Sequence, residues 1–264
     1  MTGLNPICAI LIENCRIFFL TSSYLEPSEY LLIEWSGFTL PRPSVGMELS
    51  VCSDHRKLNN CLWNSLMHVL TVLDHPNPAS FSAAVAQQFM DGAKAAGHSV
   101  ELADLHAEGF DPLWSMADID GDRHAATSAD VAKEQARIDR ADAICLVFPL
   151  FWWGMPSMTK GWIDRVWTWG WAYDQLGDPE QSLQRPRSGV LLIPAGARSD
   201  EMENEGYLAA LETAWIKGTF GYFGFSPRKL EVLYGSTGSL KRRQSLLDKS
   251  YQTGLTLAPP QRAK

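Results

Sequence analysis

The sequence predicts an α/β fold, a doubly wound parallel sheet of about five strands with helices on both faces. Short uninterrupted apolar runs, typical of strands buried on both faces, alternate with longer segments of helical period. The alternation is regular from Met67 onward, and such repetition favours parallel βαβ units with right-handed crossovers.

The first elements follow one another from residue 68. Residues 68–73 form an apolar run that we expect to be the first strand. The next segment, 82–96, carries apolar side chains at helical spacing, and Gly97 stops it. A second strand is expected at 100–102, and a second helix at 127–138, where a serine stands in the N-cap position.

The remaining elements repeat the alternation. Residues 143–148 are apolar and predict the third strand, while 190–194 and 230–233 predict the fourth and fifth. Three further helices are expected at 157–169, 205–222 and 240–255.

Residues 1–66 differ from the rest of the chain. They mix Pro, Ser and Cys with isolated apolar clusters and show no sustained period. We therefore expect an N-terminal extension, poorly ordered or arising from a mis-assigned start codon, with Met67 as the start of the domain. The alternative is a genuine arm that packs on domain 67–264.

Composition narrows the class of protein. A formal net charge of −7 leaves no basic excess to neutralise phosphates, which argues against a nucleic-acid partner. No apolar stretch is long enough to span a bilayer, and the segment 7–20 is a poor signal peptide. The five cysteines (Cys8, Cys15, Cys52, Cys61 and Cys145) lack zinc-type spacing, so we expect no metal site and a reducing, cytoplasmic location.

An aromatic loop follows the third strand. Trp152 and Trp153 stand within the segment 148–156, between the strand and the next helix. Ligands of open α/β sheets bind outside the carboxyl ends of the strands, where two indoles suit a planar ligand. The competing interpretation is that these aromatic residues are core, but two adjacent loop tryptophans cannot both enter one core.

Two other loops are expected at the same edge. After the first strand, His75 and the serines Ser80 and Ser82 stand at a helix start, where backbone N–H groups and hydroxyls can bind an anion. Simple helix capping by Ser80 is the alternative. After the fourth strand, Gly196 permits close approach of a flat ligand. Neither a Walker P-loop nor a GxGxxG motif occurs in the phosphate loop.

Three motifs resemble one family. They are His-Pro-Asn-Pro with Ser-Phe-Ser at 75–82, Phe-Pro-Leu-Phe-Trp-Trp-Gly-Met-Pro at 148–156 and Lys-Gly-Trp-Ile-Asp-Arg-Val at 160–166. Together they resemble the NAD(P)H:quinone oxidoreductase family of flavodoxin-like fold, which includes mammalian quinone reductase and bacterial relatives. The resemblance covers residues 67–257 and leaves 1–66 unmatched.

The resemblance implies a non-covalent flavin, FAD or alternatively FMN, at the carboxyl edge of the sheet. Tyr173 matches a family tyrosine that reaches the partner subunit, so a homodimer is implied, with Trp152, Trp153 and Tyr173 forming the catalytic stacking slot. The implied cofactor-binding residues are His75, Ser80, Phe81, Ser82, Pro149, Leu150, Phe151, Trp152, Gly196 and Ala197.

The implied activity is that of a flavin-dependent NAD(P)H oxidoreductase. Hydride passes from NADH or NADPH to the flavin and then, by a ping-pong sequence, to a quinone or another small aromatic acceptor in one two-electron step. Two alternatives remain: a regulatory flavoprotein that docks on a membrane transporter, and a flavodoxin-like electron carrier without a substrate slot.

One departure from the family concerns the acceptor side. A tyrosine and a histidine that are proposed to stabilise the reduced flavin of mammalian quinone reductase correspond here to Ser199 and Glu205. The same match places Ala197 at the second family glycine. Arg198 and Tyr207 are the candidate substitutes.

Overall fold

The computed structural model describes residues 18–20, 49–51, 66–121, 127–173 and 182–261. The chain divides into two compact units, Met1–Asn64 and Ser65–Lys264. In the first unit, strand β1 (Phe18–Leu20) pairs antiparallel with β2 (Leu49–Val51). The other residues of the predicted extension, including its four cysteines, lie outside the described residues, so the expectation for 1–66 remains a prediction.

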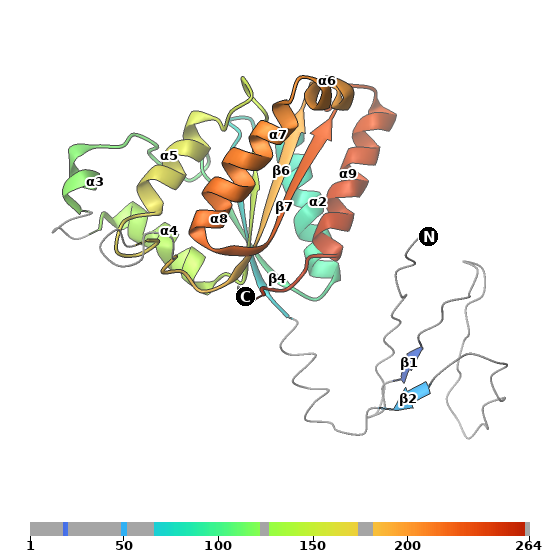
Figure 1. The fold of residues 1–264 in the computed structure, drawn as a ribbon, viewed down its shortest axis with the longest axis horizontal. Coiled ribbons are helices and arrows are strands. Elements are labelled where there is room, and N and C mark those ends of the chain that lie inside the picture. The colour runs from blue at the N-terminus through green and yellow to red at the C-terminus, as the bar shows by residue number, and fades with distance from the viewer. Residues whose placement is uncertain (1–17, 21–48, 52–65, 122–126, 174–181, 262–264) are drawn as a thin grey trace. The chain divides into compact units, whose positions relative to one another are not determined.

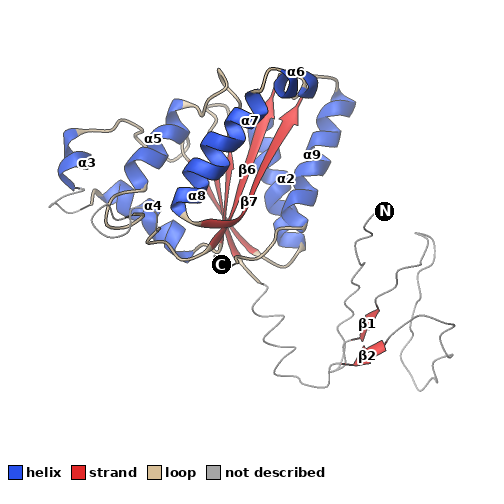
Figure 2. Ribbon diagram, viewed as in Figure 1, coloured by secondary structure: helices blue, strands red, loops and turns tan. Residues whose placement is uncertain are grey.

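The second unit contains a five-stranded parallel sheet, which confirms the predicted fold class (Figures 1 and 2). Each strand pairs in parallel with its neighbour. The spatial order is β4 (Ser99–Asp104), β3 (His68–Leu73), β5 (Ala143–Val147), β6 (Arg187–Ala195) and β7 (Phe225–Tyr234).

Helices cover both faces of this sheet (Figure 1). One layer pairs α2 (Phe81–Ala95) with α9 (Leu240–Leu255). The other layer contains α4 (Ala129–Arg140), α5 (Ser157–Val166) and a continuous rod of α7 (Tyr207–Leu211), η1 (Glu212–Phe220) and α8 (Gly221–Phe223). Two short helices, α3 (Met116–Gly121) and α6 (Ser199–Asn204), complete this unit's described part.

The alternation of side chains along each strand builds two separate cores. In β3, Leu70 and Val72 join the core beneath α4, α5 and η1, whereas Val69 and Leu73 join the core beneath α2 and α9. Every residue of β5 and β6 is buried, because helices cover both of their faces. This is why the central strands appear in the sequence as uninterrupted apolar runs.

The predicted helices differ from the observed ones at their ends. The helix expected at 157–169 ends at Val166, where Trp167 takes a non-helical C-cap conformation with ψ 68°. The segment expected as one helix at 205–222 is α7, the π-helical η1 and α8. Helix α6 was not expected, because its sequence is mostly acidic and shows no helical apolar pattern. Its fully buried side chain is that of Met202.

No described helix is long and apolar enough to cross a membrane. Cys145 in β5 is fully buried with a free thiol, and burial raises its pKa well above the usual value. It is therefore an unreactive core residue.

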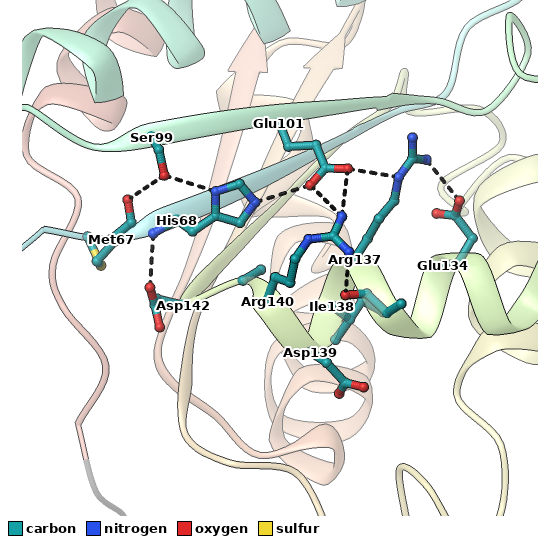
Figure 3. Close-up of polar contacts among 12 residues, drawn as sticks. Met67, His68, Ser99, Glu101, Glu134, Arg137, Ile138, Asp139, Arg140 and Asp142 are labelled. Atoms are coloured by element: carbon teal, nitrogen blue, oxygen red, sulfur yellow. Dashed lines mark hydrogen bonds and ion pairs between the residues drawn. The ribbon is translucent and has the colours of Figure 1, made fainter.

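A polar network holds α4 to the amino ends of β3 and β4, on the side opposite the loops discussed above (Figure 3). Glu101 accepts hydrogen bonds from Arg137 Nε at 3.0 Å and from Arg140 Nη2 at 3.1 Å, and its Oε2 lies 3.1 Å from His68 Nε2. Burial acts to raise the pKa of Glu101, but the hydrogen bonds from His68 and Arg140 prevail and lower it. The network stabilises the fold at an edge away from the candidate site.

Candidate functional site

The strand order places a topological switch point between β3 and β5. The chain leaves β3 for α2 on one face and leaves β5 for α5 on the other, so the two loops diverge at the edge where ligands of such sheets bind. Figure 2 shows the strand arrows of β6 and β7 running toward the side where α6 lies, which is the carboxyl edge. The predicted loops after β3, β5 and β6 therefore meet at one edge.

The loop after β5 forms a tight turn between Phe151 and Gly154, which we call the aromatic turn. Gly154 N–H donates to the Phe151 carbonyl at 2.9 Å. The two central residues, Trp152 and Trp153, have φ values of 50° and 53°. Such left-handed conformations cost non-glycine residues about 1–3 kcal/mol each and persist only where the surroundings over-determine them. The turn therefore stores strain at the expected ligand edge.

The two indoles have different surroundings. Trp152 is 91% exposed, whereas Trp153 is 42% exposed and its ring centroid lies 4.9 Å from that of Tyr207. Phe148, in contrast, is fully buried and packs edge-to-face on Trp215. The alternative that the tryptophans belong to the core is therefore wrong for Trp152, which presents an almost free apolar ring to solvent.

The residues beside the turn anchor it to the sheet. Leu150 N–H donates to the Pro194 carbonyl at 2.9 Å, and the Leu150 side chain packs on the core beneath α5. Pro149 is half-buried and Phe151 is exposed. These contacts hold residues 149–152 at the carboxyl edge of the sheet.

The loop after β3 ends at the N-terminus of α2. Ser80 is the N-cap, and its Oγ accepts from Ala83 N–H at 3.1 Å, so the capping alternative holds. The N–H groups of Phe81 and Ser82 lie in the first helical turn, where no intrahelical acceptor exists. These two N–H groups and the O–H of Ser80 can donate hydrogen bonds to an anion. The Ser82 side chain is buried.

His75 is oriented by its own loop. Its Nδ1 accepts from Asn77 N–H at 3.0 Å, so in the neutral ring the proton is on Nε2, which is available to donate. This orientation is compatible with the predicted contact between His75 and a phosphate.

Sequence reasoning missed one cation at this position. Arg243 of α9 places its guanidinium carbon 4.9 Å from the ring centroid of Phe81, at the start of α2. In the sequence, Arg243 stands in the short run Lys-Arg-Arg at 241–243, which is typical of a solvated helix face. Knowing that α9 packs beside α2 would have identified Arg243 as an anion-binding candidate.

The loop after β6 exposes its backbone at Gly196. Gly196 is exposed, and a Cβ atom built on it would have its nearest neighbours in Thr237, at 3.7 Å. Ala197 is half-buried, and its carbonyl accepts from Gly235 N–H at 3.1 Å. The exposed backbone of Gly196 is accessible to a ligand, in agreement with the expected approach there.

Tyr173 lies in a different place from the aromatic turn. With Trp114, Ile163, Trp167, Tyr222 and Phe223 it lines a cleft of about 560 Å³ formed by α5, η1 and α8. The rings of Tyr173 and Tyr222 are 5.6 Å apart. No residue of the aromatic turn lines this cleft, so within one chain the predicted catalytic residues are not all brought together.

The candidate substitutes for the missing family pair have distinct positions. Arg198 is paired with Asp200 through Nε at 2.9 Å, and this hydrogen bond raises the pKa of its guanidinium. Ser199 begins α6 and Glu205 is its C-cap, and both are exposed. Tyr207 packs against Trp153 and therefore contacts the aromatic turn directly.

Comparisons with known proteins identify a flavodoxin-like fold and relatives that are named as NAD(P)H oxidoreductases. The family model described as "Flavodoxin-like fold" matches residues 67–253. NAD(P)H dehydrogenase [quinone] 1 of Rattus norvegicus is 32% identical over 190 residues, which cover 64% of this chain and 69% of the relative. An "Uncharacterized NAD(P)H oxidoreductase" of Haemophilus influenzae is 29% identical over 189 residues, or 70% of this chain and 93% of the relative.

Solved structures give the same result. The NAD(P)H:quinone oxidoreductase from Methanothermobacter marburgensis has a TM-score of 0.64 and 30% identity, and the match covers 73% of this chain and 98% of that chain. An FMN-dependent NADH-azoreductase from Bacillus anthracis in complex with FMN, at 16% identity and a TM-score of 0.55, shares the fold.

Proposed function

Because the chain belongs to the NAD(P)H:quinone oxidoreductase family of flavodoxin-like fold, we propose that it is a flavin-dependent NAD(P)H oxidoreductase. It reduces a quinone or a similar small aromatic acceptor by two electrons, in a ping-pong sequence with NADH or NADPH as the donor. The observation that carries this proposal is the aromatic turn, which holds a nearly free indole in a strained backbone at the switch point of the sheet.

The residues at this edge fit a flavin. An exposed aromatic turn, an exposed glycine loop and a helix N-terminus next to a guanidinium correspond to a ring, its polar rim and a phosphate. No charged side chain of the aromatic turn competes for this space, because the turn contains only aromatic residues and glycine.

Each part of the site has a proposed task. His75, Ser80 and the N–H groups of Phe81 and Ser82, together with Arg243, bind the phosphate end. Residues 149–152 follow the chain and ring of the flavin, while Gly196 and Ala197 face its polar rim. When bound, the flavin supplies the two-electron hydride chemistry, and the protein orients the rings and excludes water.

The stacking slot is formed by Trp152, Trp153 and Tyr173. The ring of Trp153 packs against the ring of Tyr207, so it has a defined position before any ligand arrives. The phenol of Tyr207 is the group we assign to the acceptor side in place of the family tyrosine and histidine. The choice between FAD and FMN is tested below.

Tyr173 enters this slot only if two copies associate, and we propose a homodimer. Beside the Tyr173 cleft stands a patch of large exposed apolar side chains, Leu113, Trp114 and Met116, which is costly for a monomer to leave in water. A second copy that covers this patch would carry Tyr173 to the partner's aromatic turn. Light scattering of the full chain is expected to give a dimer, and Trp114→Glu is expected to shift it toward monomer and to lower turnover.

The test of the function begins with the purified full chain. Released flavin is identified by chromatography, and protein saturated with FAD or FMN is assayed for NADH and NADPH oxidation with menadione. We expect turnover with parallel lines in double-reciprocal plots, the signature of a ping-pong sequence. Flavin-saturated protein that fails to oxidise either nucleotide would refute the enzyme proposal.

A further inference from the structure

A buried carboxylate lies beneath the candidate site. Asp74 follows β3 directly and is 3% exposed. Its Oδ2 accepts from Thr159 N–H at 2.8 Å and from the Thr159 hydroxyl at 2.6 Å, and its Oδ1 lies 2.9 Å from His106 Nε2. Three hydrogen bonds therefore fix the carboxylate, although none of them is needed to pair the strands.

The carboxylate supplies the cap that α5 lacks. The N-cap position of α5 is Pro156, which has no side-chain oxygen, whereas α2 and α9 are capped locally by Ser80 and Ser239. A negative charge that accepts from a backbone N–H in the first turn is favourable, because the helix dipole is positive there. Asp74 thus caps α5 from a position 85 residues away in the sequence.

This cap is one of two anchors of the aromatic turn. On the β5 side, Leu150 is held to Pro194 of β6. On the α5 side, the chain leaves the turn at Gly154 and enters the helix that Asp74 holds. Between these anchors, Trp152 and Trp153 remain in left-handed conformations that an unanchored loop would relax.

We propose that Asp74, oriented by His106, is a positioning residue that holds the aromatic turn in the shape that receives the flavin ring. The inference rests on the proposed function, since it assigns Asp74 to the ring side of the same site. It also makes a prediction distinct from phosphate binding: removing the cap loosens the ring contact and leaves the phosphate loop intact.

Flavin titrations of the full chain separate the two effects. In Asp74→Ala we expect the dissociation constants of FMN and of riboflavin, which lacks the phosphate, to rise by the same factor, tenfold or more. Asp74→Asn keeps an oxygen for Thr159, and its amide N–H can donate to His106 Nε2 once the imidazole proton moves to Nδ1, so it is expected to restore both constants to within about threefold of wild type. In Ser80→Ala, FMN alone is expected to bind less tightly. FAD is titrated in parallel.

Glu134→Ala is the matched control. It truncates another buried carboxylate that touches α5, accepting from Trp162 Nε1 at 3.1 Å in the middle of the helix rather than at its start. We expect its flavin constants to stay within about twofold of wild type. If Asp74→Ala does not fold, Thr159→Val, which keeps the N–H donor but loses the hydroxyl, is expected to raise both constants severalfold.

Hydrogen exchange of the flavin-free protein gives a readout independent of flavin. Gly154 N–H, which closes the aromatic turn, is expected to exchange at least tenfold faster in Asp74→Ala than in wild type or Glu134→Ala. Unchanged Gly154 exchange with unchanged flavin constants would overturn the inference, as would a loss of FMN affinity without loss of riboflavin affinity. Wild-type protein that binds neither FAD nor FMN would instead refute the proposed function.

Discussion

Replacing Trp152 by glycine tests whether the aromatic turn trades stability for binding. The change removes a left-handed strain of about 1–2 kcal/mol, while the extra freedom of glycine in the unfolded chain costs about 0.5–1 kcal/mol. Almost no packing is lost, because the side chain is 91% exposed. The free energy of unfolding of the flavin-free protein is therefore expected to stay constant or to rise by about 1 kcal/mol, and flavin affinity is expected to fall.

The neighbouring residue provides the contrast. Trp153→Gly gains the same backbone relief but loses the ring contact with Tyr207, about 0.5–1.5 kcal/mol, and the burial of roughly half of an indole, about 1–2 kcal/mol. With the entropy cost of glycine included, we expect a net loss of about 2 kcal/mol.

Urea denaturation of the flavin-free proteins measures both changes. Trp152→Asn serves as a control, since asparagine tolerates the left-handed region without the entropy cost of glycine. A Trp152→Gly protein that is more than 1 kcal/mol less stable than wild type would show that the indole is packed, and the strain argument would then fail. Flavin affinity equal to wild type in that protein would show that the exposed ring does not contact the cofactor.

Three further outcomes are expected. Arg243→Ala should weaken FMN binding by about tenfold and riboflavin binding by less than twofold, because the Arg243 guanidinium lies at the N-terminus of α2. Fluorescence titrations measure both affinities, and equal losses would contradict a phosphate contact. Arg165→Ala should lower the free energy of unfolding by about 1.5–3 kcal/mol in urea, because buried Arg165 pairs with half-buried Asp118 at 3.0 Å; a loss below 1 kcal/mol would show that the pair is dispensable. Since the folded pKa of Glu101 is lowered, its stabilisation is present above the unfolded pKa and is lost as the pH falls through the folded value. Glu101→Gln should therefore be about 1–2 kcal/mol less stable near pH 7, and this difference should shrink as the pH is lowered through the folded pKa; a constant difference would refute an electrostatic origin.

Much of the fold could be predicted because the buried strands have a clear pattern. The apolar run at 143–148 corresponds to β5 and the buried Phe148, and the run at 68–73 is β3 itself. Helix ends were less predictable, because Trp167 is apolar and at helical spacing yet adopts a non-helical backbone that buries its ring among Phe223 and Phe225. Local propensity does not contain that tertiary contact.

The loops of the candidate site could be predicted from the sequence, but the distant side chains that contact or hold these loops could not. Gly196, Ser80 and the two tryptophans were recognisable because they follow strands that must end at one edge. Arg243 and Asp74 were not, since each acts on an element far away in the sequence: one reaches the start of α2 from α9, and the other the start of α5 from β3.

The sequence alone determined the parallel α/β fold, the edge at which the loops gather and the aromatic residues that stand there. These follow from periodicity and chain order, which are local properties. The tertiary structure decided that Trp152 is exposed in a strained turn, that Tyr173 lines a separate cleft and that Asp74 caps α5. These features depend on contacts between residues that are distant in the sequence and are brought together when the two helical layers pack on the sheet. Hydrogen bonds and backbone strain are determined only by such contacts.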